Sequence, residues 1–133
     1  MTGDIASPYY NSEPYIPETL SELMDFVVPM MGNAPHFKDE SGYLPDRSID
    51  TEFYGLVEGF GKVRDKIGED QYAAAIDIAA RMKALFLEAA DEDDPKTMQG
   101  ILLIHDLIDI IDAARARRVA SKLTDEEGRV TGD

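Results

Sequence analysis

The fold of this chain is decided by the stretch from Pro95 to Leu123, which reads PKTMQGILLIHDLIDIIDAARARRVASKL. Apolar side chains recur along it every three or four residues, which is the spacing of one face of an α-helix and not of a strand. These side chains are Met98, Ile101, Leu102, Ile104, Leu107, Ile108, Ile111 and Ala114. At about 1.5 Å of rise per residue, a helix of this length would reach about 40 Å. The stretch therefore predicts one long amphipathic helix against which the rest of the chain packs.

The two ends of this helix carry charges that favour it. Four acidic residues, 91–94, come directly before Pro95, so a carboxylate can accept hydrogen bonds from the free N–H groups while proline takes the first helical position. Arg115, Arg117 and Arg118 lie near the other end, where cations interact favourably with the negative pole of the helix dipole. The basic cluster is explained by the helix itself and predicts no ligand.

Three shorter helices are predicted upstream of the long one. The first covers about residues 19–28 and opens with the Thr-x-x-Glu spacing of a capping box. The second begins at Ser48 or Asp50 and ends before Gly68, and the third covers residues 69–90. Apolar residues recur at helical spacing in all three, and no segment alternates as a strand does.

These helices predict an all-α fold, a small helical bundle of about four helices whose last two form a long antiparallel hairpin. Residues 17–123 make up the bundle domain. Residues 1–16 show no helical or strand period and are expected to form an extended N-terminal arm. The polar residues 124–133 are expected to form a flexible tail, and residues 32–47 a loop.

The composition excludes several classes of function. The 133 residues include no cysteine, which excludes disulfides, thiolate metal sites and cysteine nucleophiles and favours a reducing compartment. No apolar run approaches the ~18 residues that span a bilayer, and the chain's start lacks the basic region of a signal peptide. The net charge of −14 opposes binding to nucleic acid and anionic membranes. We therefore expect a soluble cytoplasmic protein that binds neither of them directly.

One polar stripe of the long helix is explained neither by its apolar face nor by the charges at its ends. His105, Asp109 and Asp112 fall at i, i+4 and i+7, so they share one side of the helix. In an antiparallel hairpin, Asp77 of the preceding helix would stand near Asp109. These residues are candidate ligands of a divalent metal, or a carboxylate-oriented histidine that transfers protons. The alternative is that the stripes are separate solvated faces, with Asp77 paired to Arg81 on its own helix.

The segment Leu-Leu-Ile-His-Asp-Leu around His105 resembles the His–Asp signature of the HD-domain metal phosphohydrolases, which are also all-helical. The resemblance implies a metal-dependent phosphohydrolase, with His105, Asp106 and Asp109 as candidate catalytic residues. That family places another histidine on an earlier helix, where this chain has residues 70–72, Asp-Gln-Tyr. The other histidine of the chain is His36, in a predicted loop.

A second resemblance involves acidic pairs. Glu88-x-x-Asp91 followed by Asp106-x-x-Asp109 is similar to the paired Glu-x-x-Glu and Glu-x-x-Asp motifs of the all-α nucleotide pyrophosphatases, with aspartate replacing glutamate at two positions. In the predicted hairpin, Glu88 stands level with Met98, so Asp106 would lie about 12 Å further along the axis. Neither resemblance covers enough of the chain to name a family.

Two groups of residues are candidates for binding a partner protein. Tyr9, Tyr10 and Tyr15 lie in the predicted arm, where aromatic side chains either pack on the chain's own apolar surface or form a partner motif. Gly55 and Gly59 lie four residues apart on the second helix and leave a stripe free of side chains. Such a stripe favours close packing of another helix over contact with a ligand.

The leading hypothesis is an acidic, non-enzymatic protein–protein interaction module, such as an inhibitor, an immunity-type factor, an adaptor or a chaperone-like protein. It needs no cofactor, and its charge favours a basic partner protein. One alternative is a metal-dependent phosphohydrolase-like protein that uses His105, Asp106 and Asp109. Another is a self-associating structural protein, a homodimer with the long helix as its dimer face.

Overall fold

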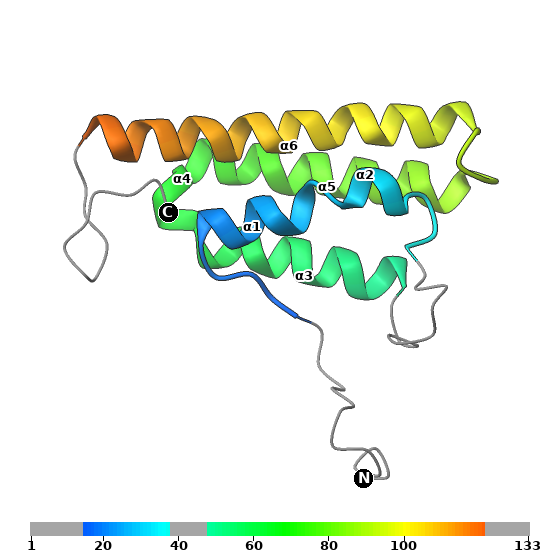
Figure 1. Ribbon diagram of the computed structural model, residues 1–133, viewed down its shortest axis with the longest axis horizontal. Coiled ribbons are helices and arrows are strands. Elements are labelled where there is room, and N and C mark those ends of the chain that lie inside the picture. Colours follow the sequence, from blue (N-terminus) through cyan, green and yellow to red (C-terminus); the bar gives the residue numbers. More distant parts are fainter. Residues whose placement is uncertain (1–14, 38–47, 122–133) are drawn as a thin grey trace, which may run out of the picture.

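The computed structural model of the chain describes residues 15–37 and 48–121, and every regular element within these ranges is a helix (Figure 1). The prediction of a small all-α bundle is confirmed. Most of the predicted arm and the whole predicted tail lie outside the described residues. In chain order the helices are α1 (Leu20–Val27), α2 (Met30–Asn33), α3 (Ile49–Lys62), α4 (Arg64–Ile67), α5 (Glu69–Glu88) and α6 (Pro95–Ala120).

The helix α1 begins as the sequence predicts, at a capping threonine. The backbone N–H of Glu22 donates to Thr19 Oγ1 at 3.0 Å, and the Glu22 carboxylate accepts from the backbone N–H of Glu18 at 2.9 Å. This helix ends next to Val28, as the sequence predicts. The short helix α2 then follows Pro29 and includes residues 32 and 33, the first two residues of the predicted loop. Its first residue, Met30, is fully buried.

Ser48, and not Asp50, caps α3. The backbone N–H of Thr51 donates to Ser48 Oγ at 3.3 Å, and the backbone N–H of Ser48 donates to Thr51 Oγ1 at 2.9 Å, so the two side chains cap reciprocally. The predicted single helix up to residue 67 is interrupted at Val63, and α4 follows as one separate turn. Val63 departs from helical geometry, with φ −106° and ψ 13°, and it is fully buried.

The helices α5 and α6 are joined by a short turn and pack along one another (Figure 1). Asp94 organises the turn, because its carboxylate accepts from the backbone N–H of Ala90 at 2.8 Å and from that of Lys96 at 2.9 Å. Further along, the ring of Phe86 lies directly on Gly100, where any side chain would collide with it. The hydrogen bonds of Asp94 and the contact between Phe86 and Gly100 hold α5 and α6 close together.

The hydrophobic core lies between α6 and the helices α1, α3 and α5. The inner face of α6 contributes Ile104, Leu107 and Ile111, all fully buried, at the helical spacing that the sequence showed. Met98 and Leu102 were expected on the same apolar face, but 57% and 58% of these residues are exposed. They lie outside the contact because the apolar arc of α6 is wider than the face that its neighbours cover. No helix in the described ranges is long and apolar enough to cross a membrane.

Candidate functional site

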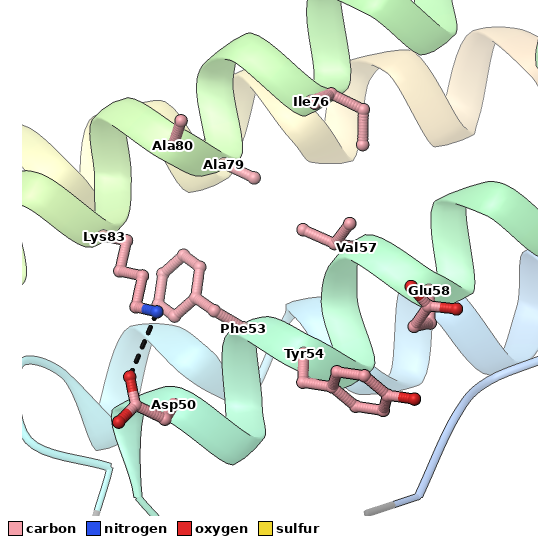
Figure 2. Close-up of a pocket in the computed structure, with 9 residues that line it drawn as sticks. All are labelled: Asp50, Phe53, Tyr54, Val57, Glu58, Ile76, Ala79, Ala80 and Lys83. Atoms are coloured by element: carbon pink, nitrogen blue, oxygen red, sulfur yellow. Dashed lines mark ion pairs between the residues drawn. The ribbon is translucent and has the colours of Figure 1, made fainter.

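An open groove of about 540 Å³ lies between α3 and α5 (Figure 2). Side chains from both helices line it, and most of them are apolar. The lining residues are Asp50, Phe53, Tyr54, Val57 and Glu58 of α3 and Ile76, Ala79, Ala80 and Lys83 of α5. We call this feature the α3/α5 groove.

The α3/α5 groove exists because small side chains of α5 face larger ones of α3. Ala79 and Ala80 line the α5 side of the groove, and Val57 and Tyr54 line its α3 side (Figure 2). Two methyl groups cannot fill the distance between two helix backbones, which are about 8–10 Å apart in packed pairs. The result is a concave apolar surface that stays open to solvent.

The floor of the groove is held by an aromatic cluster. Phe53 is almost fully buried, and its ring centroid lies 5.9 Å from that of Phe37, edge to face. Phe86 completes the cluster, with its centroid 5.4 Å from that of Phe37 and 6.3 Å from that of Phe53. Such edge and tilted contacts are favourable arrangements of aromatic rings. A ligand in the groove would therefore meet a surface that is fixed from behind by the core.

Charged residues mark the two ends of the groove. Lys83 Nζ lies 3.0 Å from Asp50 Oδ1 and joins α5 to α3 across one end (Figure 2). The Asp50 side chain stays 79% exposed, so this ion pair contributes at most about 1 kcal/mol to folding. Glu58 lies at the other end of the groove. Both acidic groups belong to α3, and Lys83 is the single cation of the lining.

Two exposed apolar residues lie on the helices that border the groove. Tyr54 lines the groove and is 50% exposed. Leu87 is 62% exposed and continues the α5 stripe of Ile76, Ala80 and Lys83 by one more turn. Large apolar side chains that gather beside a concave site are typical of surfaces that bind other molecules.

The polar residues predicted for a metal or catalytic site are all exposed on their helices. His105, Asp106, Asp109 and Asp112 lie on the outer side of α6. Asp77 of α5 is exposed too, and one of its carboxylate oxygens lies 3.7 Å from Arg81 on the same helix. Within residues 15–37 and 48–121, no three histidine or acidic side chains gather closely enough to hold a metal ion. The four α6 residues thus share one exposed side of that helix, and Asp77 lies on α5.

The glycine stripe of α3 is covered by the chain itself. A Cβ atom at Gly55 would lie 2.7 Å from the carbonyl oxygen of Tyr15, and one at Gly59 would lie 2.6 Å from Pro17 Cγ. The two glycines therefore allow residues 15–17 to lie against α3, and in this arrangement the stripe is closed to other helices. The candidate residues Tyr9 and Tyr10 lie outside the described residues.

Tyr15 packs over α1 as well as α3. Its ring stacks on that of Phe26 with a centroid distance of 6.0 Å, although 58% of the residue is exposed. Partial burial raises the pKa of the Tyr15 hydroxyl, and the nearby carboxylates of Glu22, Asp25 and Glu18 raise it further. The hydroxyl is therefore neutral at physiological pH and serves as an uncharged contact.

Sequence reasoning missed most of the α3/α5 groove. The sequence predicted the helices on both sides of the groove, but it gave Tyr54 and Lys83 no role and did not indicate that a groove lies between the helices. A signal was present, because the adjacent alanines Ala79 and Ala80 interrupt a face of large apolar residues. Which helix they face depends on the rotation of α5, and a sequence pattern does not determine that rotation.

Comparison of the chain with protein families, with curated proteins and with solved structures finds no match.

Proposed function

We propose that this protein is a non-enzymatic protein–protein interaction module that binds a partner protein through the α3/α5 groove. The observation that carries the proposal is the groove itself, a concave apolar surface between two helices with the half-exposed Tyr54 in its lining. Grooves between helices are a common docking place for amphipathic segments of other proteins. Aromatic residues at such places contribute a large part of binding energy.

The charge of the protein supports the same proposal. A net charge of −14 draws basic proteins into encounter and speeds their association. The absence of cysteine fits a reducing compartment, and a cytoplasmic location is part of the proposal. A metal-dependent hydrolase has less support, because His105, Asp106 and Asp109 are exposed along one helix without a described acidic partner close enough to complete a metal site.

A substitution that fills the groove tests the proposal. Ala80→Leu places a larger side chain in the open space, so we expect it to reduce partner capture at least tenfold, which is about 1.4 kcal/mol of binding free energy. Ala113→Leu on α6 is the matched control, because Ala113 is also an exposed helical alanine and lies outside the groove lining. The measurement is the amount of partner protein that each variant captures from extracts of the native host. It is made at a temperature at which both variants are fully folded.

If the Ala80→Leu variant captured as much partner protein as the wild type, a role of the groove in binding would be contradicted. Light scattering on the eluted complexes gives the stoichiometry and separates a partner protein from a second copy of this chain. If the Ala113→Leu variant alone lost the partner, the interface would lie on α6.

A further inference from the structure

We propose that the α3/α5 groove binds a basic amphipathic helix of the partner protein, that Asp50 and Glu58 pair with cations of this helix, and that Lys83 competes with it for Asp50. This inference rests on the proposed function and adds the chemistry of the partner. Its three parts come from the length of the groove, from the charges of its lining and from the ion pair that closes one end.

The length of the groove fits a short helix. Asp50 and Glu58 are eight residues apart on α3, which corresponds to about 12 Å along the helix axis. About two turns of a bound helix cover the same distance. Such a helix would present apolar side chains at i, i+3, i+4 and i+7, which is the pattern of helices that dock in apolar grooves. The apolar lining from Phe53 to Val57 and from Ile76 to Ala80 lies between the two acidic ends.

The charges of the lining favour a basic helix over an acidic one. The groove has a carboxylate at each end, and its single cation, Lys83, is already paired. An occupant with cations seven or eight residues apart could therefore reach Asp50 and Glu58 at once while its apolar face covers Tyr54 and Ile76. An acidic occupant would meet two like charges in a protein whose net charge is −14.

Lys83 makes the inference testable because it opposes binding in this arrangement. Its ammonium group lies 3.0 Å from the Asp50 carboxylate, so a cation of the partner must share or displace it. Removal of Lys83 frees Asp50 and removes a like charge from the site, which strengthens binding of a basic helix. Removal of the Asp50 charge weakens it. If the ion pair only held α3 to α5, both substitutions would loosen the groove and change affinity in the same direction.

The experiment uses fluorescence anisotropy with synthetic helical probes and the full chain. The basic probe has leucines at i, i+3, i+4 and i+7, with lysines about eight residues apart beside this face. We expect Asp50→Asn to weaken its binding about threefold to fivefold, and Lys83→Met to strengthen it by a similar factor, as is usual for exposed charge pairs. Asp112→Asn on the outer face of α6 removes one charge far from the groove lining and should leave the affinity unchanged.

Two further probes separate this inference from the proposed function. One has glutamates in place of the lysines, and the other has the same composition with its leucines scrambled off one face. Equal binding of the lysine and glutamate probes, both abolished by Ala80→Leu, would overturn the basic-partner inference while the groove remained a binding site. If Ala80→Leu left probe binding unchanged, or if no probe bound at millimolar concentration, both the basic-partner inference and the role of the groove would be overturned. Self-association that Ala80→Leu abolishes would assign the groove to a second copy of the chain and also overturn the inference.

Discussion

At the scale of single residues, glycine marks where this bundle packs most closely. Gly100 of α6 lies under the ring of Phe86 without room for a Cβ atom, and Gly55 of α3 lies under the backbone of Tyr15. Gly61 of α3 has open space around its Cβ position. Glycine therefore permits close packing at Gly55 and Gly100, whereas at Gly61 it lowers helix stability and no close contact requires it.

Alanine substitutions distinguish these positions. Gly61→Ala removes a flexible residue from a helix with no steric cost, so we expect the protein to become about 0.5 kcal/mol more stable. Gly100→Ala gains the same helix preference but pushes into the Phe86 ring, and overpacking of this kind costs about 1–3 kcal/mol. We expect it to be destabilised by about 1 kcal/mol or more. Urea denaturation of both variants at one pH checks these signs, and a stabilised Gly100→Ala variant would show that α5 and α6 can separate at this point.

Single residues also show which contacts could not be predicted from the sequence. The spacing of Gly55 and Gly59 predicted close packing of another helix, but it could not tell that residues 15–17 would lie against them. The spacing of His105 and Asp109 correctly placed both on one side of a helix. Exposure of that side depends on how α6 is rotated against its neighbours, and only the three-dimensional packing fixes that rotation.

At the scale of elements, the ends of the helices were the most predictable feature. Local hydrogen bonds decide them, and the residues that make these bonds are adjacent in the sequence, such as Thr19 before α1 and Asp94 before α6. The interruption at Val63 was not predicted, because neither glycine nor proline marks this position in the sequence and the apolar spacing continues from Val63 to Ile67.

The Asp94 cap predicts a pH dependence of stability. The backbone N–H groups of Ala90 and Lys96 stabilise the charged carboxylate and lower the pKa of Asp94. Its stabilisation is therefore complete above the usual aspartate pKa of about 3.9, and it is lost as the pH falls through the lowered value of the folded protein. We expect Asp94→Asn to lower the Tm by a few degrees at pH 6, and the difference from the wild type to shrink towards pH 2.5.

The Tm difference between the two proteins isolates Asp94, because the other acidic groups titrate in both. A difference that stayed constant from pH 6 to pH 2.5 would mean that the Asp94 charge does not contribute. Glu69 offers a comparison at the start of α5, where the Arg64 guanidinium, 2.6 Å away, likewise lowers the pKa of the carboxyl.

At the scale of the whole molecule, the described helices of the bundle leave the face between α3 and α5 unfilled. The helices α1, α3, α5 and α6 close a common core, whereas Ala79 and Ala80 leave the α3/α5 groove open. Sequence periodicity predicted the core because burial repeats with the helix. It did not predict the groove, because an unfilled space depends on side chains from two helices at once.

Hydrogen exchange of the captured complex locates the binding surface. We expect the partner to slow amide exchange at residues 50–58 of α3 and 76–83 of α5, which border the groove, and to leave residues 102–112 of α6 unchanged. Protection of residues 102–112, where His105 and Asp109 are exposed, with no change at α3 and α5 would contradict this expectation.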